Sequence, residues 1–400
     1  MSSDEKSMPK ALLILLIFSI VVEGALYSAI VPMLPFFTRE FDLSDSAAGL
    51  LVSGYSAGLV AGSLLTVVVL RFIGVRNVMC AGLLAFSAST VAFAVSDTST
   101  LLTTARTGQG LAAGVLSTAC IFWLLDAAGP AQRGAVLGRA LSYTFIGTIA
   151  GPLIGTVAVQ YGIALSYSVV AVCCGLAAGL LARMPEPQDR RESERAPAYP
   201  TSHPRSTAYI GVWIVALVGA LAGLTNLAGP LMLTRVGASD VFVGAVFVVA
   251  SLATIVVGRV TGAVADGRGA LLPLSVGLLV AIALLIVFGI EFGPILNGLI
   301  VMGLMVSVFV CFVPGGVLLT RGGEAIGWPL RFAIALSSTA WGIGETVGAS
   351  ATGFGLDSVG ALGTYSIAAG IAVLSLGVAM WFGRRHGESQ LRRADHVNVV

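Results

Sequence analysis

Long apolar segments alternate with short polar ones along the whole chain, and this pattern predicts the fold class. Each apolar segment has about 20 residues or more, the length of helix that crosses a bilayer core of about 30 Å. Strands of a membrane barrel would alternate apolar with polar residues, whereas these segments are continuously apolar. Helices are therefore expected at 11–37, 47–70, 78–96, 100–125, 136–160, 163–182, 208–234, 241–265, 270–290, 294–320, 331–355 and 360–383. The sequence predicts an all-α membrane protein with twelve transmembrane helices.

The composition indicates an exterior that is solvated by lipid. Of the 400 residues, 56% are hydrophobic and 10% are charged, against about 45–50% and 25% in soluble domains. A water-facing globule cannot bury so large an apolar fraction, so a soluble enzyme is excluded. The five cysteines all fall within apolar segments and lack the spacing of a metal site or a disulfide framework. We therefore expect no metal and no cofactor.

Basic residues are divided unequally between the two sides that twelve crossings define. With a cytoplasmic N-terminus, Arg39 and Arg235 fall outside, Arg106 falls within a span, and the other 19 of the 22 basic residues fall inside. Cytoplasmic loops carry such an excess, so both ends, 1–10 and 384–400, are predicted to be cytoplasmic. Only two of the 22 are lysines, a bias typical of GC-rich bacterial coding. We expect a multi-pass protein of a bacterial cytoplasmic (inner) membrane.

A polar stretch at 183–207, rich in proline and charge, divides the apolar segments into two sets of six. This composition is typical of a flexible linker. We expect an N-terminal six-helix bundle at 11–182 and a C-terminal six-helix bundle at 208–383. Parallel halves of this kind occur in some secondary transporters.

Glycine, acid and arginine residues occur together where the eighth and second spans meet the cytoplasm. The first sequence is Gly262-Ala-Val-Ala-Asp266-Gly-Arg-Gly269, and the second keeps Gly74 and Arg76 but has an arginine in place of the acid. Glycine lets two helices approach closely, and a carboxylate can stabilise a neighbouring helix N-terminus. Both sequences resemble the G-x-x-x-D-R-x-G-R signature of the major facilitator superfamily. An ordinary interfacial loop is the alternative at each place.

The fourth span contains Arg106, followed by Gln109 and a glycine. A guanidinium within the membrane costs a few kcal/mol, which favours a position facing a wet cavity or a carboxylate. The alternative is an arginine that hydrogen-bonds loop carbonyls, because it lies near the outer end of its helix. The spacing resembles the R-x-x-Q-G motif of the same superfamily, and this resemblance implies that Arg106 takes part in proton or cation coupling.

The most specific pattern is a glycine repeat in the fifth span. Gly147, Gly151 and Gly155 recur every four residues, and Pro152 follows the second of them. Such a repeat makes a smooth stripe against which another helix can pack, and the proline bends the helix. Packing alone would explain the glycines. With the proline, the sequence resembles G-x-x-x-G-P-x-x-G, the motif of the twelve-span drug:proton antiporter branch.

Two acids interrupt otherwise apolar spans, Glu23 in the first and Glu345 in the eleventh. Glu23 lies 13 residues after Lys10 and Glu345 lies 14 after Arg331, so both are expected about 20 Å from the cytoplasmic side. Both positions resemble acids of vesicular monoamine transporter-like multidrug efflux transporters, and the resemblance implies proton and cation coupling. At each position the alternative is a neutral glutamate that bridges two helices through hydrogen bonds.

Other polar residues within the spans are candidates for lining a substrate cavity, although tyrosine and tryptophan also pack between helices. These candidates are Tyr27, Gln109, Tyr143, Asn226, Asn297 and Trp341. The three histidines all lie in the linker or the C-terminal tail. Carboxylates are therefore expected to carry any proton chemistry within the membrane.

These features predict a secondary transporter and not an enzyme. The sequence has neither a G-x-x-x-x-G-K-[ST] loop for ATP nor an H-E-x-x-H zinc motif. We expect a proton-driven exporter of small cationic or amphiphilic compounds, such as drugs and antibiotics, that works by alternating access. Its expected partners are protons, a small-molecule substrate and the lipid bilayer, without nucleic acid, and the chain is expected to be a monomer. The alternatives are an importer or a metabolite exporter and, more remotely, a membrane-embedded enzyme or a non-transporting receptor.

Overall fold

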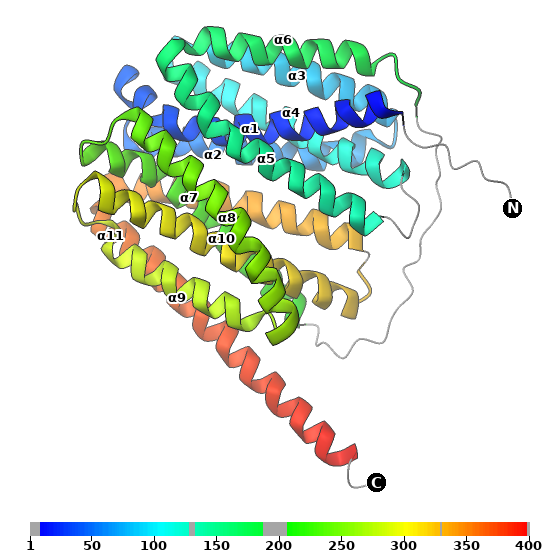
Figure 1. The fold of residues 1–400 in the computed structure, drawn as a ribbon, viewed down its shortest axis with the longest axis vertical. Helices are drawn as coiled ribbons and strands as arrows, with labels where there is room; N and C mark the ends of the chain where they lie inside the picture. The colour runs from blue at the N-terminus through cyan, green and yellow to red at the C-terminus, as the bar shows by residue number, and fades with distance from the viewer. Residues whose placement is uncertain (1–8, 128–132, 187–205, 329, 398–400) are drawn as a thin grey trace, which may run out of the picture. The chain divides into compact units, whose positions relative to one another are not determined.

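The computed structural model describes residues 9–127, 133–186, 206–328 and 330–397, which contain helices and no strands (Figure 1). The helices are α1 (Lys10–Glu40), α2 (Asp45–Val69), α3 (Val75–Ala94), α4 (Ser99–Ala127), α5 (Arg133–Tyr161), α6 (Ile163–Leu181), α7 (Ser206–Arg235), α8 (Asp240–Arg268), α9 (Leu271–Phe288), α10 (Pro294–Ala325) and α11 (Leu330–Val397). In this part of the chain, ten helices are long and apolar enough to cross a membrane. The predicted all-helical membrane fold is confirmed. Residues 1–8 and 398–400 of the predicted termini, and 187–205 of the predicted linker, lie outside the described residues.

α11 is longer than a single span because two helices run together within it. Gly360 interrupts it with a φ of 73° and a ψ of 176°, a combination that glycine adopts without the steric cost of a side chain. The spans predicted at 331–355 and 360–383 both fall within this one element.

By its internal contacts the chain divides into two compact units. Unit 1 comprises Met1–Glu194 and Ala238–Val248, and unit 2 comprises Arg195–Gly237 and Val249–Val400. In unit 1, α1 packs against α5, α2 packs against α4, and α3 packs against both α4 and α6. In unit 2, α7 and α9 each pack against both α10 and α11.

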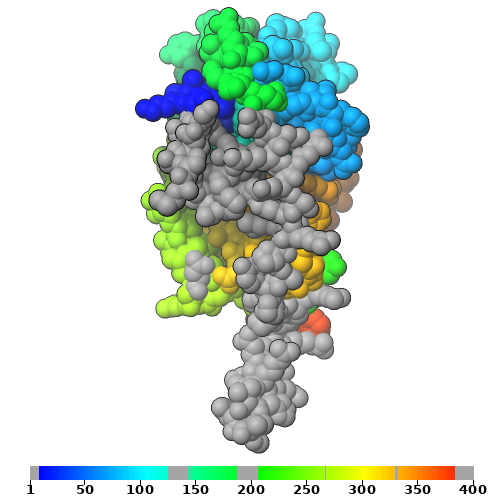
Figure 2. Space-filling model, turned by 90° about the vertical axis from the view of Figure 1, so that its right-hand side faces the viewer, coloured from blue at the N-terminus to red at the C-terminus, as the bar shows by residue number. Residues whose placement is uncertain are grey.

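α6 illustrates how the outer helices divide their surface between protein and lipid. Large apolar side chains are exposed along one face of it, three or four residues apart. These are Leu165, Val169, Val172, Leu176 and Leu180. On another side, α6 lies against α3, and Figure 2 shows the two in direct contact, α6 in green and α3 in light blue. The exposed apolar face is suited to contact with lipid.

In unit 1, α1 and α5 approach each other closely along a row of glycines. A methyl group added at Gly147, Gly151 or Gly155 of α5 would collide with main-chain carbonyl oxygens of α1. Gly24 of α1 lies against the main chain of α5 in the same way. The glycine stripe of the fifth span therefore faces α1, along the segment that contains Glu23.

In unit 2, α7 and α11 interlock through two glycines from each helix. Gly219 and Gly223 of α7 lie against the main chain of α11, and Gly344 and Gly348 of α11 lie against the main chain of α7. A methyl group at any of the four would collide with the backbone of the facing helix. Lipid gives no hydrophobic drive for helices to associate, so van der Waals contact of this kind holds them together.

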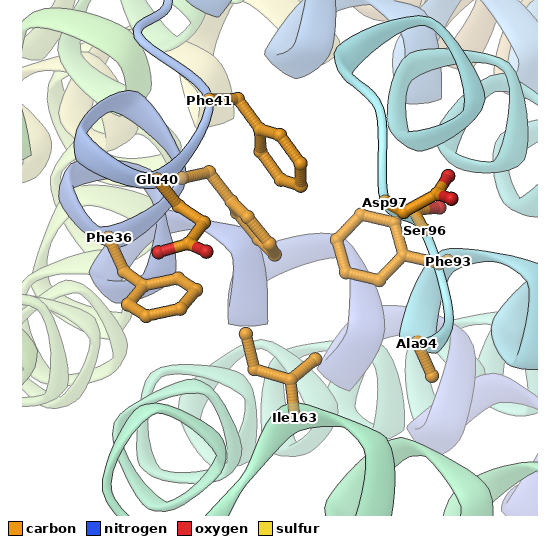
Figure 3. A pocket seen from close by; sticks show the side chains of 9 residues that line it. Phe36, Glu40, Phe41, Phe93, Ala94, Ser96, Asp97 and Ile163 are labelled. Atoms are coloured by element: carbon orange, nitrogen blue, oxygen red, sulfur yellow. The ribbon is translucent and has the colours of Figure 1, made fainter.

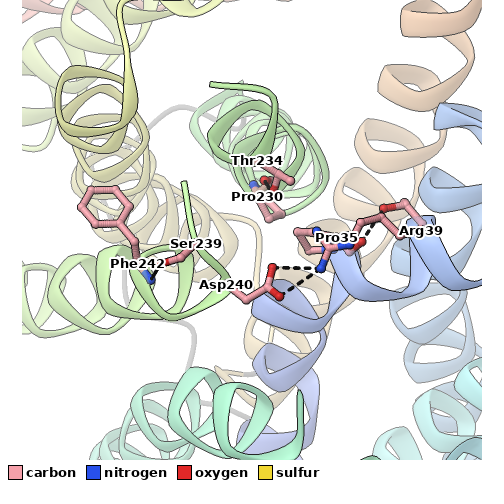
Figure 4. A network of polar contacts seen from close by, with 8 residues as sticks. Pro35, Arg39, Pro230, Thr234, Ser239, Asp240 and Phe242 are labelled. Atoms are coloured by element: carbon pink, nitrogen blue, oxygen red, sulfur yellow. Dashed lines mark hydrogen bonds and ion pairs between the residues drawn. The ribbon is translucent and has the colours of Figure 1, made fainter. Parts of the chain in front are cut away.

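The start of α8 belongs to unit 1. Arg39, near the end of α1, forms an exposed ion pair with Asp240, the first residue of α8 (Figure 4). Nη2 of Arg39 lies 3.0 Å from Oδ2 and 3.2 Å from Oδ1 of Asp240. Four residues further along α8, Gly244 lies against the side chain of Thr156 in α5. α8 therefore begins in unit 1 and enters unit 2 at Val249.

We expect Gly151→Leu to destabilise unit 1, because the new side chain would be forced against the backbone of α1. Overpacking costs about 1–3 kcal/mol, so the midpoint of thermal unfolding in detergent should fall. Gly179→Leu is the matched control, because Gly179 is exposed on α6 and, among the residues that the structure describes, none places an atom of another helix within 4 Å of an added methyl group. Equal midpoints for the two variants would contradict the close α1–α5 contact.

Candidate functional site

Glu23 lies in the middle of α1 and is 7% exposed. Its main-chain oxygen accepts a hydrogen bond from the hydroxyl of Tyr55 in α2, at 3.1 Å. Within the described residues, its carboxylate takes part in no hydrogen bond or ion pair. A buried charge is costly unless it is neutralised, so this position favours the binding of a proton or a cation.

Arg106 links three helices of unit 1. From α4, its Nη1 and Nη2 donate hydrogen bonds to the carbonyl oxygens of Leu26 and Tyr27 in α1, at 2.9 and 2.7 Å. Its guanidinium carbon lies 4.3 Å from the centre of the Tyr55 ring in α2, a cation–π contact. The side chain is 1% exposed. The two acceptor carbonyls belong to helix α1 and not to a loop, which differs from the loop carbonyls given as the alternative from the sequence.

Gln109 extends this network to α3. Its Oε1 accepts a hydrogen bond from Nη1 of Arg106 at 3.2 Å, and its Nε2 donates one to Oγ1 of Thr90 at 3.2 Å. The Tyr27 ring lies beside Tyr55, with centroids 5.7 Å apart. Sequence alone does not single out Thr90, because threonine is a common residue in membrane-spanning helices. Tyr143, on α5, is half-buried and takes part in none of the hydrogen bonds described for this network.

In unit 2, Glu345 has hydrogen-bond donors at both carboxylate oxygens. Nδ2 of Asn226 in α7 lies 3.3 Å from Oε1, and Nε1 of Trp341 lies 3.2 Å from Oε2. Phe312 of α10 stands edge-on to the Trp341 ring, with centroids 5.0 Å apart and an interplanar angle of 81°. Glu345 is 2% exposed. Three of the predicted residues thus form one cluster, with Phe312 as an additional member.

Asn297 lies outside this cluster. Its Oδ1 accepts a hydrogen bond from the main-chain nitrogen of Phe292 at 3.0 Å, and its Nδ2 donates to the carbonyl oxygen of Ile290 at 3.1 Å. Both ends of the buried amide are used to hold the connection between α9 and α10. The described hydrogen bonds of the Asn297 side chain thus hold a loop together, and none of them joins it to Glu345.

Glu186 supplies a carboxylate near the second-span motif, which lacks an acid of its own. Gly74 is the N-cap of α3, and the main-chain nitrogen of Arg76 donates a hydrogen bond to Oε1 of Glu186 at 3.2 Å. Nε of Arg76 lies 3.3 Å from Oε2. A carboxylate is favourable at a helix N-terminus because of the helix dipole. Sequence alone does not reveal this role, because Glu186 lies 110 residues after Arg76.

The corresponding motif at the end of α8 is organised differently. Gly269 follows the last residue of α8 with a φ of 87°, so this glycine ends the helix in the left-handed region. In the part of the chain that the structure describes, no atom of another helix lies within 4 Å of a methyl group added at Gly262. The side chain of Asp266 lies outside the described residues.

Several known proteins resemble this chain in sequence. The Major Facilitator Superfamily matches residues 16–323. The MFS-type transporter ppzB of Metarhizium majus is 29% identical over 161 residues, which are 39% of this chain and 35% of that protein. The quinolone resistance protein NorA of Staphylococcus aureus is 27% identical over 126 residues, 32% of each chain. The matched segments thus span about a third of the length of these relatives.

Two solved structures resemble the fold over most of its length. A bacterial homologue of the human lysosomal transporter Spinster has a TM-score of 0.70 at 16% identity and covers 94% of this chain and 96% of its own. A D-xylose–proton symporter has a TM-score of 0.69 at 14% identity and covers 93% and 96%. At these identities, the likeness concerns the fold alone.

We expect Arg106→Lys to lower the stability of unit 1. Lysine lacks the planar fork that reaches two carbonyl oxygens at once, and each hydrogen bond to a charged group is worth about 1.5–3 kcal/mol. Arg39→Lys is the matched control, because an exposed ion pair contributes about 0–1 kcal/mol. The free energies of unfolding of both variants in denaturant should therefore differ clearly. Similar values would mean that the Arg106 hydrogen bonds contribute little.

Proposed function

The chain belongs to the major facilitator superfamily, and from this premise we propose that it is a proton-coupled secondary transporter that exports small cationic or amphiphilic compounds by alternating access. The main support is Glu23, a buried carboxylate without a hydrogen bond or ion pair in the described part of the chain. Similarity to a quinolone resistance protein agrees with export of drugs, and similarity to an MFS-type transporter agrees with transport in general.

A proton and a substrate cation are two alternative ways to neutralise Glu23. Either one removes the cost of a bare carboxylate among apolar side chains. Since both need the same oxygens, binding of one expels the other. Competition at one carboxylate is sufficient to exchange inward-moving protons for outward-moving cations.

We assign Glu345 a related role within unit 2. Asn226 and Trp341 each donate a hydrogen bond to the carboxylate, and these bonds fix its orientation. The Trp341 ring beside it, packed against Phe312, offers an aromatic surface of the kind that organic cations favour. A proton or a cation at Glu345 would therefore meet an oriented carboxylate next to an aromatic face.

We further propose twelve crossings, with both ends in the cytoplasm of a bacterial inner membrane. Ten candidate spans are found when α11 is counted once, over Phe332–Phe382. Division of α11 at Gly360 adds one span, and α5, with its apolar part Ile146–Tyr161, adds another. The excess of basic residues in the loops on one side supports the orientation.

Glu23→Gln should reduce proton-driven accumulation of ethidium in inverted membrane vesicles to background, because an amide neither takes up a proton nor neutralises a cation. The unfolding midpoint should stay close to that of the wild type. Glu324→Gln, at the exposed end of α10, is the matched control and should transport normally. Wild-type accumulation by Glu23→Gln would refute the proposal. Ethidium movement in the opposite direction under the same gradient would identify an importer.

As the pH is lowered, a proton displaces ethidium from Glu345, and in Trp341→Phe this loss of ethidium binding should occur at a higher pH than in the wild type. The change removes the indole donor to Oε2 of Glu345, so a proton competes better with the cation. Hydrogen bonds to charged groups are worth about 1.5–3 kcal/mol, which corresponds to a shift of about one pH unit or more. The binding midpoint can be measured by fluorescence polarisation across pH.

Trp213→Phe provides the control for this substitution. The Trp213 indole donates to Oγ of Ser375 at 3.0 Å, in the same unit but away from the acid cluster. Its removal should leave the pH midpoint unchanged. An unchanged midpoint in both variants would remove Glu345 from the cation site and leave Glu23 alone.

A further inference from the structure

A hollow of about 300 Å³ lies at one end of unit 1, some distance along α1 from Glu23. It is bounded by the end of α1, by the connection between α3 and α4, and by the first residue of α6, Ile163 (Figure 3). Glu40 lies 17 residues beyond Glu23 in the same helix, which corresponds to about 25 Å. The hollow is therefore separate from the site proposed for transport.

Four of the nine residues that line the hollow are phenylalanines, of which Phe37 and Phe93 are buried and Phe36 and Phe41 are partly exposed. Phe37 and Phe93 meet edge to face, with centroids 5.4 Å apart and an interplanar angle of 85°. Phe41 stacks on Phe37 with ring centroids 6.1 Å apart, and Phe36 meets Phe37 edge to face at 5.5 Å. Phe93 also stacks on the buried Tyr167 at 5.2 Å, which fixes its position. The wall is thus held in place before any ligand binds.

Two exposed carboxylates flank these rings. Figure 3 shows Glu40 on the α1 side of the hollow and Asp97 on the opposite side, after α3. Neither takes part in a hydrogen bond or an ion pair within the described residues. The neighbouring cation, Arg39, is paired with Asp240.

The surrounding end of unit 1 is strongly negative. The charged residues in the α1–α2 and α3–α4 connections and at the adjoining helix ends, as far as these are described, are the acids Glu40, Asp42, Asp45, Asp97 and Asp240 and the base Arg39. A surface of one sign raises the local concentration of ions of the opposite sign. Cations are therefore drawn to the end of the unit that holds the hollow.

We propose that this hollow is a second, peripheral binding site for small aromatic organic cations. The partly exposed rings of Phe36 and Phe41 suit an aromatic group, and a quaternary or protonated amine gains from these two rings and from Glu40 and Asp97. A volume of about 300 Å³ is at the lower end of the range for ligand pockets. The site selects for charge and aromaticity together, which a purely acidic or a purely apolar surface does not.

The test measures binding of radiolabelled benzyltrimethylammonium by equilibrium dialysis, with the full chain in dodecyl maltoside. The starting protein carries Glu23→Gln and Glu345→Gln, so that binding at the proposed transport site does not contribute. Adding Glu40→Gln and Asp97→Asn should weaken the remaining binding by about tenfold or more, as should Phe41→Ala. If the starting variant does not fold, the same measurement compares the wild type with a variant that carries only Glu40→Gln and Asp97→Asn.

Asp42→Asn is the matched control. Asp42 lies at the same end of the unit and does not line the hollow, and asparagine tolerates its φ of 47°. This change should alter binding by less than about twofold, because separated surface charges are screened by salt. Equal effects of Asp42→Asn and of the Glu40 and Asp97 changes would overturn the proposal, since they would reflect the overall field alone.

The amine of a lipid headgroup offers the same ammonium chemistry as a free organic cation. A second experiment distinguishes the lipid from the free cation. Phosphatidylethanolamine is added to the micelles at increasing amounts while probe binding is followed. Retained binding supports a site for free organic cations. Loss of the binding that depends on Glu40 and Asp97 would assign the hollow to a lipid and overturn the proposal.

Discussion

Direct contact between helix backbones is the constraint on which both units depend. Lipid tails solvate apolar side chains as well as a neighbouring helix does, so association requires many close van der Waals contacts. Glycines provide these contacts between α1 and α5 and between α7 and α11. Glu23 lies on the segment of α1 that the α5 glycines cover, and the main chain of Glu345 lies directly against Gly219 and Gly223. The positions of both buried acids are therefore set by backbone packing.

The two acids differ in what surrounds their carboxylates. Glu345 is held at both oxygens by neutral donors, which restrict its rotamers. Around Glu23, the described polar groups serve other partners, since Tyr55 bonds to its main chain and Arg106 bonds to the carbonyls that follow it in α1. Within the proposed mechanism, Glu345 is an oriented acceptor, and Glu23 is the group that can exchange one neutralising ligand for another.

Hydropathy predicts most of this fold because the membrane leaves few solutions for an apolar chain. Buried backbone groups must be paired within the segment, so about 20 apolar residues imply a helix. The ends are less predictable: α1 was expected at 11–37 and extends over Lys10–Glu40, because apolarity does not decide where a turn begins. Contacts between distant residues are least predictable. The roles of Glu186 and Asn297 follow from partners that only the folded chain brings near.

The position of Arg106 has a consequence for how the protein is made. Its partners lie in α1 and α2, which are synthesised before α4. A charged arginine within an isolated membrane helix is costly unless it finds polar partners. That cost falls once the carbonyl oxygens of Leu26 and Tyr27 and the ring of Tyr55 are within reach. Stable insertion of the fourth helix is thus coupled to the earlier arrival of the first two, so the order of translation is also an order of assembly.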